Sequence, residues 1–137
     1  LWILSAAALV FLAGYHAGAD ATAKAASNRV YELRTYHTHP GRLEALQNRF
    51  RNHTTRIFEK HGMKNIGYWV PSDGEAKNDT LIYVLSYESR DAAKKAWADF
   101  RVDPEWKKVS TESEKDGKIV MKVDSVYMDP TDYSALK

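Results

Sequence analysis

The sequence predicts one domain of the α+β class, built on an antiparallel sheet with elements in the order β-α-β-β-α-β. Strand-like and helix-like periodicities follow one another in that order, and turn residues separate them. The chain has 137 residues, of which 44% are hydrophobic and 12% aromatic, and this content is sufficient for one core. We expect the domain to occupy residues 28–137 and residues 1–27 to lie outside it.

The first two elements are a strand and a long helix. Residues 30–36 (VYELRTY) are β-branched or aromatic at alternate positions, which is typical of a strand. Pro40-Gly41 then opens a helix that Gly62 closes as its C-cap. The apolar residues of this helix recur at helical spacing, at Leu43, Leu46, Phe50, Ile57 and Phe58.

A hairpin is predicted next. Residues 66–70 (IGYWV) and 80–87 (TLIYVLSY) have strand composition, and the segment between them, residues 71–79 (PSDGEAKND), is rich in turn formers. Two strands joined by such a loop are expected to pair in antiparallel fashion.

The last third of the chain predicts two helical segments and a final strand. Ser89 is a favourable N-cap for the first helix, and Asp103-Pro104 ends it and starts a second, shorter one. Asp116-Gly117 is a turn before a strand at residues 118–128. The complete order is that of the ferredoxin-like split β-α-β fold.

The second and third predicted strands are apolar on both faces, which indicates assembly. In the strand at residues 80–87 one face carries Leu81, Tyr83 and Leu85, and the other carries Ile82 and Val84. The two helices of a ferredoxin-like domain cover only one face, and an uncovered face would ordinarily be polar. We therefore expect a homodimer in which two sheets pack face to face.

Charged residues in the first and last strands have two interpretations. If these strands are neighbours, Glu32 and Arg34 are expected to form one charged network with Lys122 and Asp124, beside an apolar and aromatic floor. This network is either a ladder of cross-strand ion pairs or a surface that faces a ligand.

Composition excludes several classes of protein. The chain has no cysteine, so disulfide scaffolds and cysteine-ligated zinc or iron–sulfur sites are excluded. A formal charge of +2, from 20 Lys and Arg against 18 Asp and Glu, gives no indication of nucleic-acid binding. Sequence motifs of nucleotide-binding loops, serine hydrolases and zinc proteases are also absent from the sequence.

Residues 1–27 have the pattern of an export signal followed by an alanine-rich linker. Residues 1–14 (LWILSAAALVFLAG) are apolar except for Ser5, and this run is shorter than the roughly 20 residues of a membrane-spanning helix. Ala17-Gly18-Ala19 matches a small-residue cleavage site. We expect an exported protein, periplasmic or secreted, which touches a membrane only if this segment stays uncleaved as an anchor.

Four segments closely resemble the NIPSNAP family, and the resemblance runs from Val30 to Tyr133. They are VYELRTYHTHPG (30–41), HGMKNIGYW (61–69), AAKKAWADFRVDPEWKKV (92–109) and SEKDGKIVMKVDSVYM (113–128). The resemblance implies a ferredoxin-like domain that pairs into a dimeric α+β barrel. It implies no reaction, because the family has no well-established general enzymatic activity. Animal members are mitochondrial and usually carry two copies of the domain, and neither property is transferred to this chain.

The histidines are the main candidates for chemistry. His37 and His39 are two residues apart, but two ligands are too few for a structural metal site, and we predict no metal. His53 lies at an apolar position of the first helix, where it is either a hydrogen-bonded core residue or a pocket-facing acid, base or ligand contact. His61 lies in the last helical turn, where its protonated form would suit the helix dipole.

Two functions from different classes fit these observations. The first is an exported homodimer, without enzymatic activity, that binds a small apolar or aromatic molecule or a protein partner. The second is an enzyme, because proteins that share the dimeric α+β barrel include cofactor-free monooxygenases, isomerases and haem-dependent proteins; haem enters only through this analogy, and no cofactor is predicted. In the enzyme, Arg34 would bind an anionic group, Tyr36 and Trp69 would shape the pocket and His53 would move protons. The ligand-binding candidates are Glu32, Arg34, Tyr36, His53, Tyr68, Trp69 and Trp97, with core or interface packing as the alternative for the tryptophans.

Overall fold

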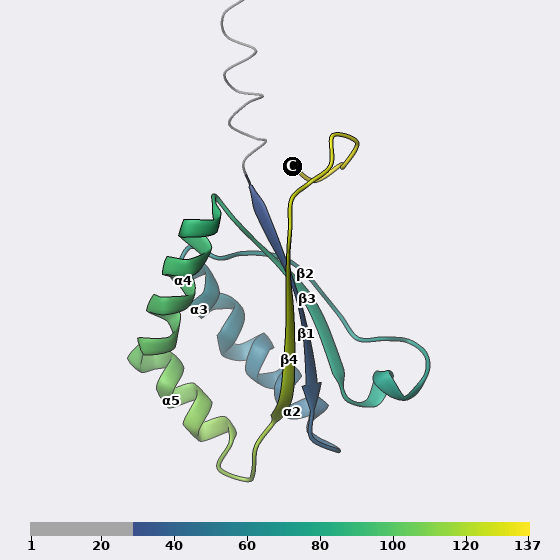
Figure 1. Cartoon of the computed structure of the whole chain (residues 1–137). Helices are drawn as coiled ribbons and strands as arrows, with labels where there is room; N and C mark the ends of the chain where they lie inside the picture. The colour runs from purple at the N-terminus through teal and green to yellow at the C-terminus, as the bar shows by residue number, and fades with distance from the viewer. Residues whose placement is uncertain (1–28) are drawn as a thin grey trace, which may run out of the picture.

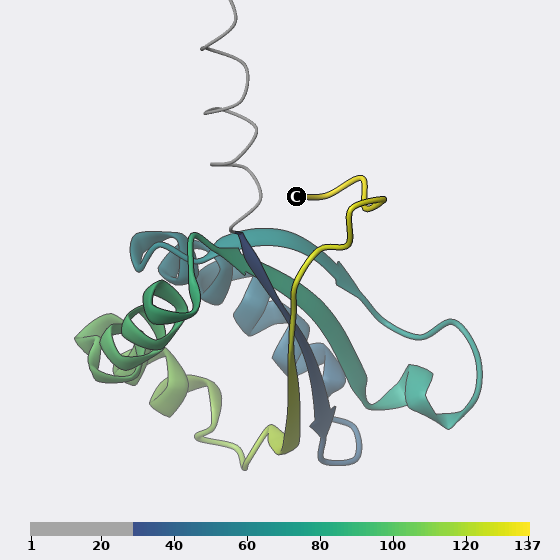
Figure 2. The same cartoon turned by 45° about the horizontal axis from the view of Figure 1, so that its top comes forward.

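A computed structural model describes residues 29–137. Four strands form one antiparallel sheet in the order β2-β3-β1-β4, and all the α-helices of these residues lie on one face of it (Figures 1 and 2). The strands are β1 (Val30–Thr38), β2 (Lys64–Trp69), β3 (Thr80–Tyr87) and β4 (Val120–Met128). This is the predicted ferredoxin-like arrangement, and the fold prediction is confirmed. The predicted leader, residues 1–27, lies outside the described residues.

The first predicted helix is divided by a π-helical turn. It consists of α2 (Leu43–Arg49), the π-turn η1 (Phe50–Thr54) and α3 (Thr55–Lys60). The hydroxyl of Thr54 donates to the Arg49 carbonyl, and that of Thr55 donates to the Phe50 carbonyl, so both side chains reach back five residues. Gly62 follows the helix at φ +78°, a conformation that favours glycine and ends the helix as expected.

The second helical region has the predicted caps. Helix α4 (Arg90–Val102) begins after Ser89, whose hydroxyl accepts from the Ala92 backbone N–H at 3.0 Å. Helix α5 (Pro104–Ser113) begins after Asp103, whose carboxylate accepts from the Glu105 N–H at 2.7 Å. A short 3₁₀ turn, η2 (Glu75–Asn78), lies in the hairpin loop between β2 and β3. Among residues 29–137, none of the helices has the length and hydropathy needed to cross a bilayer.

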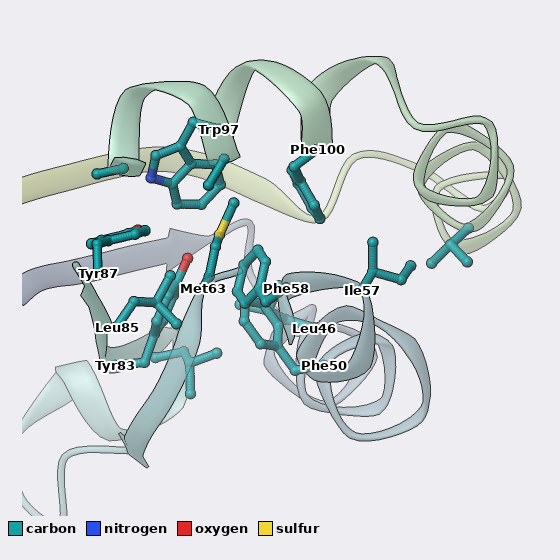
Figure 3. Packing of buried hydrophobic residues seen from close by; sticks show 14 of the residues in the cluster. Leu46, Phe50, Ile57, Phe58, Met63, Tyr83, Leu85, Tyr87, Trp97 and Phe100 are labelled. Carbon is teal, nitrogen blue, oxygen red and sulfur yellow. The ribbon is translucent and has the colours of Figure 1, made fainter. Parts of the chain in front are cut away.

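The core lies between the helices and one face of the sheet. Trp97 and Phe100 extend from α4 toward the sheet and pack near Phe58, Tyr83 and Tyr87 (Figure 3). The Trp97 and Phe100 rings each lie against Phe58, with centroids 5.4 and 5.0 Å apart. The helix-facing residues of β3 belong to this core, as the alternation predicts.

The other face of the sheet carries an apolar patch, and no helix of residues 29–137 covers it. In register, Leu33 of β1 lies opposite Val84 on one side and Val126 on the other. Trp69 lies opposite Ile82, and its side chain is 53% exposed. We call this surface the open face, defined by Leu33, Gly67, Trp69, Ile82, Val84 and Val126. Its apolar character agrees with the sequence prediction.

The predicted network of four charges is wrong, because the register separates them onto opposite faces. Arg34 lies opposite Ser125 on the helix-facing side, whereas Asp124 lies opposite Thr35 on the open side. Each pair therefore forms within its own strand. Arg34 bonds Glu32 at 2.7 Å and Lys122 bonds Asp124 at 2.9 Å, so neither a common ligand-facing surface nor a cross-strand ladder forms.

Candidate functional site

A carboxylate is buried beneath α4 and accepts four hydrogen bonds. The Glu32 side chain points from β1 toward the helices and is 1% exposed. Its Oε1 accepts from Arg34 Nη1 at 2.7 Å and from Ser125 Oγ at 2.6 Å. Its Oε2 accepts from Tyr87 Oη at 2.5 Å and from Trp97 Nε1 at 2.8 Å. Three strands and a helix thus converge on one side chain.

These contacts keep Glu32 ionised. Burial raises the pKa of a carboxyl, but the bonds from Ser125, Tyr87, Trp97 and Arg34 outweigh it, so the pKa of Glu32 lies below its ordinary value of 4.5. Burial of a charge is tolerated when it is paired and hydrogen-bonded. Each oxygen of Glu32 already accepts two hydrogen bonds, so the role of this carboxylate is to position the four side chains that donate to it.

Arg34 is positioned by Glu32 but retains unused donors. Its guanidinium carbon lies over the Trp97 ring, 4.2 Å from the centroid, in a cation–π contact. Its Nη2 donates to Tyr36 Oη at 3.4 Å, a long bond. Its Nε is buried and has no acceptor among the described residues. Burial lowers the pKa of Arg34, but the oxygens of Tyr36, Tyr83 and Glu32 raise it above its ordinary value, so Arg34 is charged.

A cavity of about 470 Å³ lies beside these residues, between α4 and strands β1 and β4. We call it the α4 cavity. Its lining residues are Glu32, Arg34, Arg90, Asp91, Lys94, Trp97, Arg101, Ser125 and Tyr127. This volume falls in the range of small-molecule sites, which is roughly 300–1,000 Å³.

The α4 cavity has an excess of positive charge. Four cationic side chains line it against two carboxylates, and Glu32 is already matched by Arg34. Within residues 29–137, no carboxylate lies within 4 Å of Arg90, Lys94 or Arg101. Unpaired cations around a partly enclosed cavity favour an anionic ligand.

A second arginine in the cavity also stacks on an aromatic ring. The guanidinium carbon of Arg90 lies 3.4 Å from the centroid of the Tyr127 ring. Burial raises the pKa of Tyr127 and the Glu32 carboxylate raises it further, so the phenol is neutral at physiological pH. The cavity is therefore walled by two arginine–aromatic pairs, Arg34 with Trp97 and Arg90 with Tyr127.

The structure brings together only part of the predicted ligand set. Glu32, Arg34 and Trp97 line the α4 cavity, and Tyr36 contacts it indirectly through Arg34. Tyr68 stacks on the buried Tyr83 and lines a separate hollow of about 200 Å³. Trp69 lies on the open face, on the opposite side of the sheet, so Tyr68 and Trp69 do not belong to the same site as Arg34.

The interpretation of His53 as a core residue is wrong, because this side chain is exposed. The wider π-turn changes which residues face the core, and Thr54 is buried in place of His53. His53 lines a different hollow, of about 340 Å³, between η1 and α5. The structure therefore does not place it where it could move protons for a ligand beside Arg34.

Two other histidines, His61 and His37, lie beside carboxylates. His61 caps the end of α3, as predicted, and its Nε2 lies 2.6 Å from Asp103 Oδ2. Lys60 Nζ lies 2.7 Å from the same oxygen, and together the bonds from Lys60 and His61 lower the pKa of Asp103. This cluster ties the end of α3 to the start of α5.

His37 lies 3.3 Å from Asp124 on the open side of the sheet. Throughout residues 29–137, His, Cys, Asp and Glu nowhere gather in a group of three that could hold a metal ion.

Sequence reasoning missed most of the cationic residues of the α4 cavity. Arg90, Lys94, Trp97 and Arg101 recur at intervals of four, three and four residues, which places them on one side of a helix. From that spacing alone, these three cations and Trp97 could have been predicted to face the same site. The neighbouring Lys95 lies off this side of the helix and pairs with Asp99 at 2.5 Å, whereas Lys94 lines the cavity.

Comparison with known proteins gives one family. The NIPSNAP family profile matches residues 31–135. No match was found among curated proteins.

Solved structures with the same fold include several NIPSNAP proteins. One from Agrobacterium tumefaciens, described as of unknown function, superposes with a TM-score of 0.69 at 21% identity, over 81% of this chain and 96% of that one. Another from the same organism gives 0.70 at 20% identity, over 80% and 100%. SnoaB of Streptomyces nogalater, a cofactor-independent oxygenase, gives 0.51 at 10% identity, over 79% and 98%. At these identities the similarity shows the fold alone.

Proposed function

The chain belongs to the NIPSNAP family, and we propose that it is a homodimeric binding protein whose α4 cavity takes a small organic anion. The observation that carries this proposal is the state of Arg34. It is charged, positioned by a buried carboxylate and stacked on Trp97, and it has a buried Nε donor without an acceptor among the described residues. Buried donors are normally paired, so a site that leaves one open is suited to a ligand that accepts it.

The lining of the cavity favours binding over catalysis. Glu32 is saturated by four donors, and the raised pKa of Tyr127 keeps the phenol protonated at neutral pH. None of the lining residues is a histidine or a cysteine. Apart from Asp91, the charged residues that remain free are cations, which orient and neutralise an anion but do not accept a proton from it.

The binding test uses benzoate, an aromatic carboxylate. We expect calorimetric titration of the purified protein at low ionic strength to show saturable binding, and Arg34→Gln to weaken it at least about ten-fold through loss of a charge-assisted pair. Arg51→Gln is the matched control, since Arg51 is 60% exposed and lies away from the cavity. Arg34→Gln also breaks a buried ion pair and can therefore weaken binding by destabilising the fold. Lys94→Gln, at the rim of the cavity, removes a cation without breaking an ion pair of the described residues and tests the loss of benzoate affinity independently. Binding that is absent, or unchanged in both cavity variants, would contradict the proposal.

An enzyme is the second candidate, and the observation that favours it is the fold shared with SnoaB. A cofactor-independent oxygenase needs its protein chiefly to hold and orient the substrate, which a cationic cavity can do for an acidic phenol. Aerobic incubation with such a phenol, followed by mass spectrometry, would distinguish the two functions. A product that gains oxygen in the wild type but not in Arg34→Gln supports the enzyme, and intact bound phenol supports the binding protein.

The homodimer is proposed from the open face. This face is apolar along three neighbouring strands, and Val126 on it is 56% exposed. Apolar surface of this kind is stabilised when a second layer covers it, and a second copy supplies an identical face.

Charge placed on the open face should separate the dimer. We expect light scattering to find a dimer for residues 28–137 and a monomer for Val126→Glu. Val102→Glu is the control, because Val102 is 64% exposed but lies at the end of α4, on the helical side of the sheet. A wild-type monomer at micromolar concentration would contradict the dimer. Export also remains a proposal, and cell fractionation of the full-length protein would test it.

A further inference from the structure

We propose that the α4 cavity selects organic dianions in which two acid groups are separated by about the length of an aromatic ring. This inference rests on the proposed binding function and specifies its ligand class. It follows from the presence of two similar arginine sites within one cavity.

Each site consists of an arginine whose guanidinium carbon lies over an aromatic ring. Arg34 lies over Trp97 and Arg90 lies over Tyr127. A guanidinium that stacks by its face keeps its N–H groups at the edge for a carboxylate or a phosphate. Within residues 29–137 the guanidinium N–H groups of Arg90 make no hydrogen bond, and Arg34, whose Nη1 bonds Glu32 and whose Nη2 bonds Tyr36, keeps its Nε without an acceptor. Both arginines line the cavity, so each can bind one acid group of the same ligand.

The spacing of the two sites comes from the secondary structure. Tyr127 lies opposite Glu32 in register, and Glu32 is two residues from Arg34 along β1, which is about 7 Å. On the helix, Arg90 and Trp97 are seven residues apart, which is about 10 Å along the axis. The backbone positions that carry the two stacked pairs are therefore about 7–10 Å apart on both the strand and the helix. Acid groups in para positions of one aromatic ring match the shorter of these separations.

The charges of the cavity agree with a ligand of charge −2. Arg34 neutralises Glu32, and Asp91 compensates one of the three cations Arg90, Lys94 and Arg101. Two positive charges remain without a counter-charge among the lining residues. A monoanion would leave one of them unmatched, whereas a dianion restores neutrality within the cavity.

Terephthalate and benzoate form a matched pair of probes, because they differ by one carboxylate. We expect calorimetric titration at low ionic strength to show terephthalate binding at least about ten-fold tighter than benzoate, and its affinity to fall more steeply with added salt. Arg90→Gln should bring terephthalate to the level of benzoate and leave benzoate within about two-fold of its wild-type affinity. Arg51→Gln should change neither.

The outcomes separate this inference from the proposed function. Equal wild-type affinities for the two probes, or an Arg90→Gln variant that weakens both equally, would overturn the dianion inference while the binding function stands. If neither probe binds, both fail. Arg90 is exposed and has no ion-pair partner within residues 29–137, so its replacement should leave the fold intact, and an unchanged circular dichroism spectrum checks this.

Discussion

The indole N–H of Trp97 donates a 2.8 Å hydrogen bond to Oε2 of Glu32, a residue 65 positions earlier in the chain. This bond joins the middle of α4 to the middle of the sheet beneath it. The same indole ring carries the Arg34 guanidinium on its face. One tryptophan therefore fixes both partners of the buried ion pair and determines the shape of the cavity wall.

Replacing the buried carboxylate should destabilise the domain strongly. Glu32→Gln removes the charge that neutralises Arg34 and places an amide N–H₂ where two donors now point. Breaking one partner of a buried ion pair typically costs about 3 kcal/mol or more, so we expect a loss of that size in urea unfolding at neutral pH. Glu44→Gln is the control, because Glu44 is 70% exposed and its ion pair should contribute less than about 1 kcal/mol. Similar losses of unfolding free energy in the two variants would show that Glu32 stabilises the domain no more than an exposed carboxylate does.

The contribution of Glu32 should depend on pH. The folded state lowers its pKa below the ordinary value of 4.5, so its stabilisation is fully present above that value and is lost as the pH falls through the lower folded pKa. The difference in unfolding free energy between the wild type and Glu32→Gln should therefore be constant from pH 7 to about pH 5 and shrink at lower pH. Urea unfolding across this series measures it, and a difference that grows toward acid would contradict the assignment of an ionised Glu32.

Trp97→Phe separates the hydrogen bond of the indole from its packing. Phenylalanine keeps an aromatic face for Arg34 but has no N–H, which leaves Oε2 of Glu32 with Tyr87 as its donor. Loss of a hydrogen bond to a buried charge should lower the unfolding free energy by about 2 kcal/mol, and the smaller ring adds a packing term.

Trp106→Phe is the comparison for this substitution. Trp106 packs against the same core, and within residues 29–137 its indole nitrogen makes no hydrogen bond, so this variant shows the packing term alone. Equal losses in the two variants would mean that the bond from Trp97 to Glu32 contributes nothing measurable.

Gly67→Ala should alter the open face without unfolding the domain. A β-carbon at Gly67 would lie 2.7 Å from Cζ2 of the Trp69 ring, and even closer to Cη2, so the indole must move. Trp69 is 53% exposed and free to do so, and we expect the free energy of unfolding of the monomer to change by less than about 1 kcal/mol. The tryptophan emission and the dimer dissociation constant should both shift. In a Trp69→Ala background, Gly67→Ala should change the dimer dissociation constant little. An undiminished change in that background would show that the effect of Gly67→Ala does not act through Trp69.

Much of the fold was predictable because its signals are local. Ser89 and Asp103 cap helices through bonds to backbone N–H groups two or three residues away, and such bonds can be read from short segments. The π-turn was not predicted, and for that reason His53 was wrongly placed. An extra residue in one helical turn leaves the apolar spacing nearly unchanged but rotates the residues between Phe50 and Ile57.

By itself, the sequence determined the order of the elements, the family and an apolar pattern on both faces of the sheet, because each depends on residues close together in the chain. The tertiary structure alone decided the site. Strand register placed Glu32 and Arg34 with Ser125 and separated them from Lys122 and Asp124. The position of α4 over the sheet then brought Trp97 to that carboxylate and three cations to the cavity beside it. Register and packing depend on contacts between residues roughly 50 or more positions apart, and no local pattern reports them.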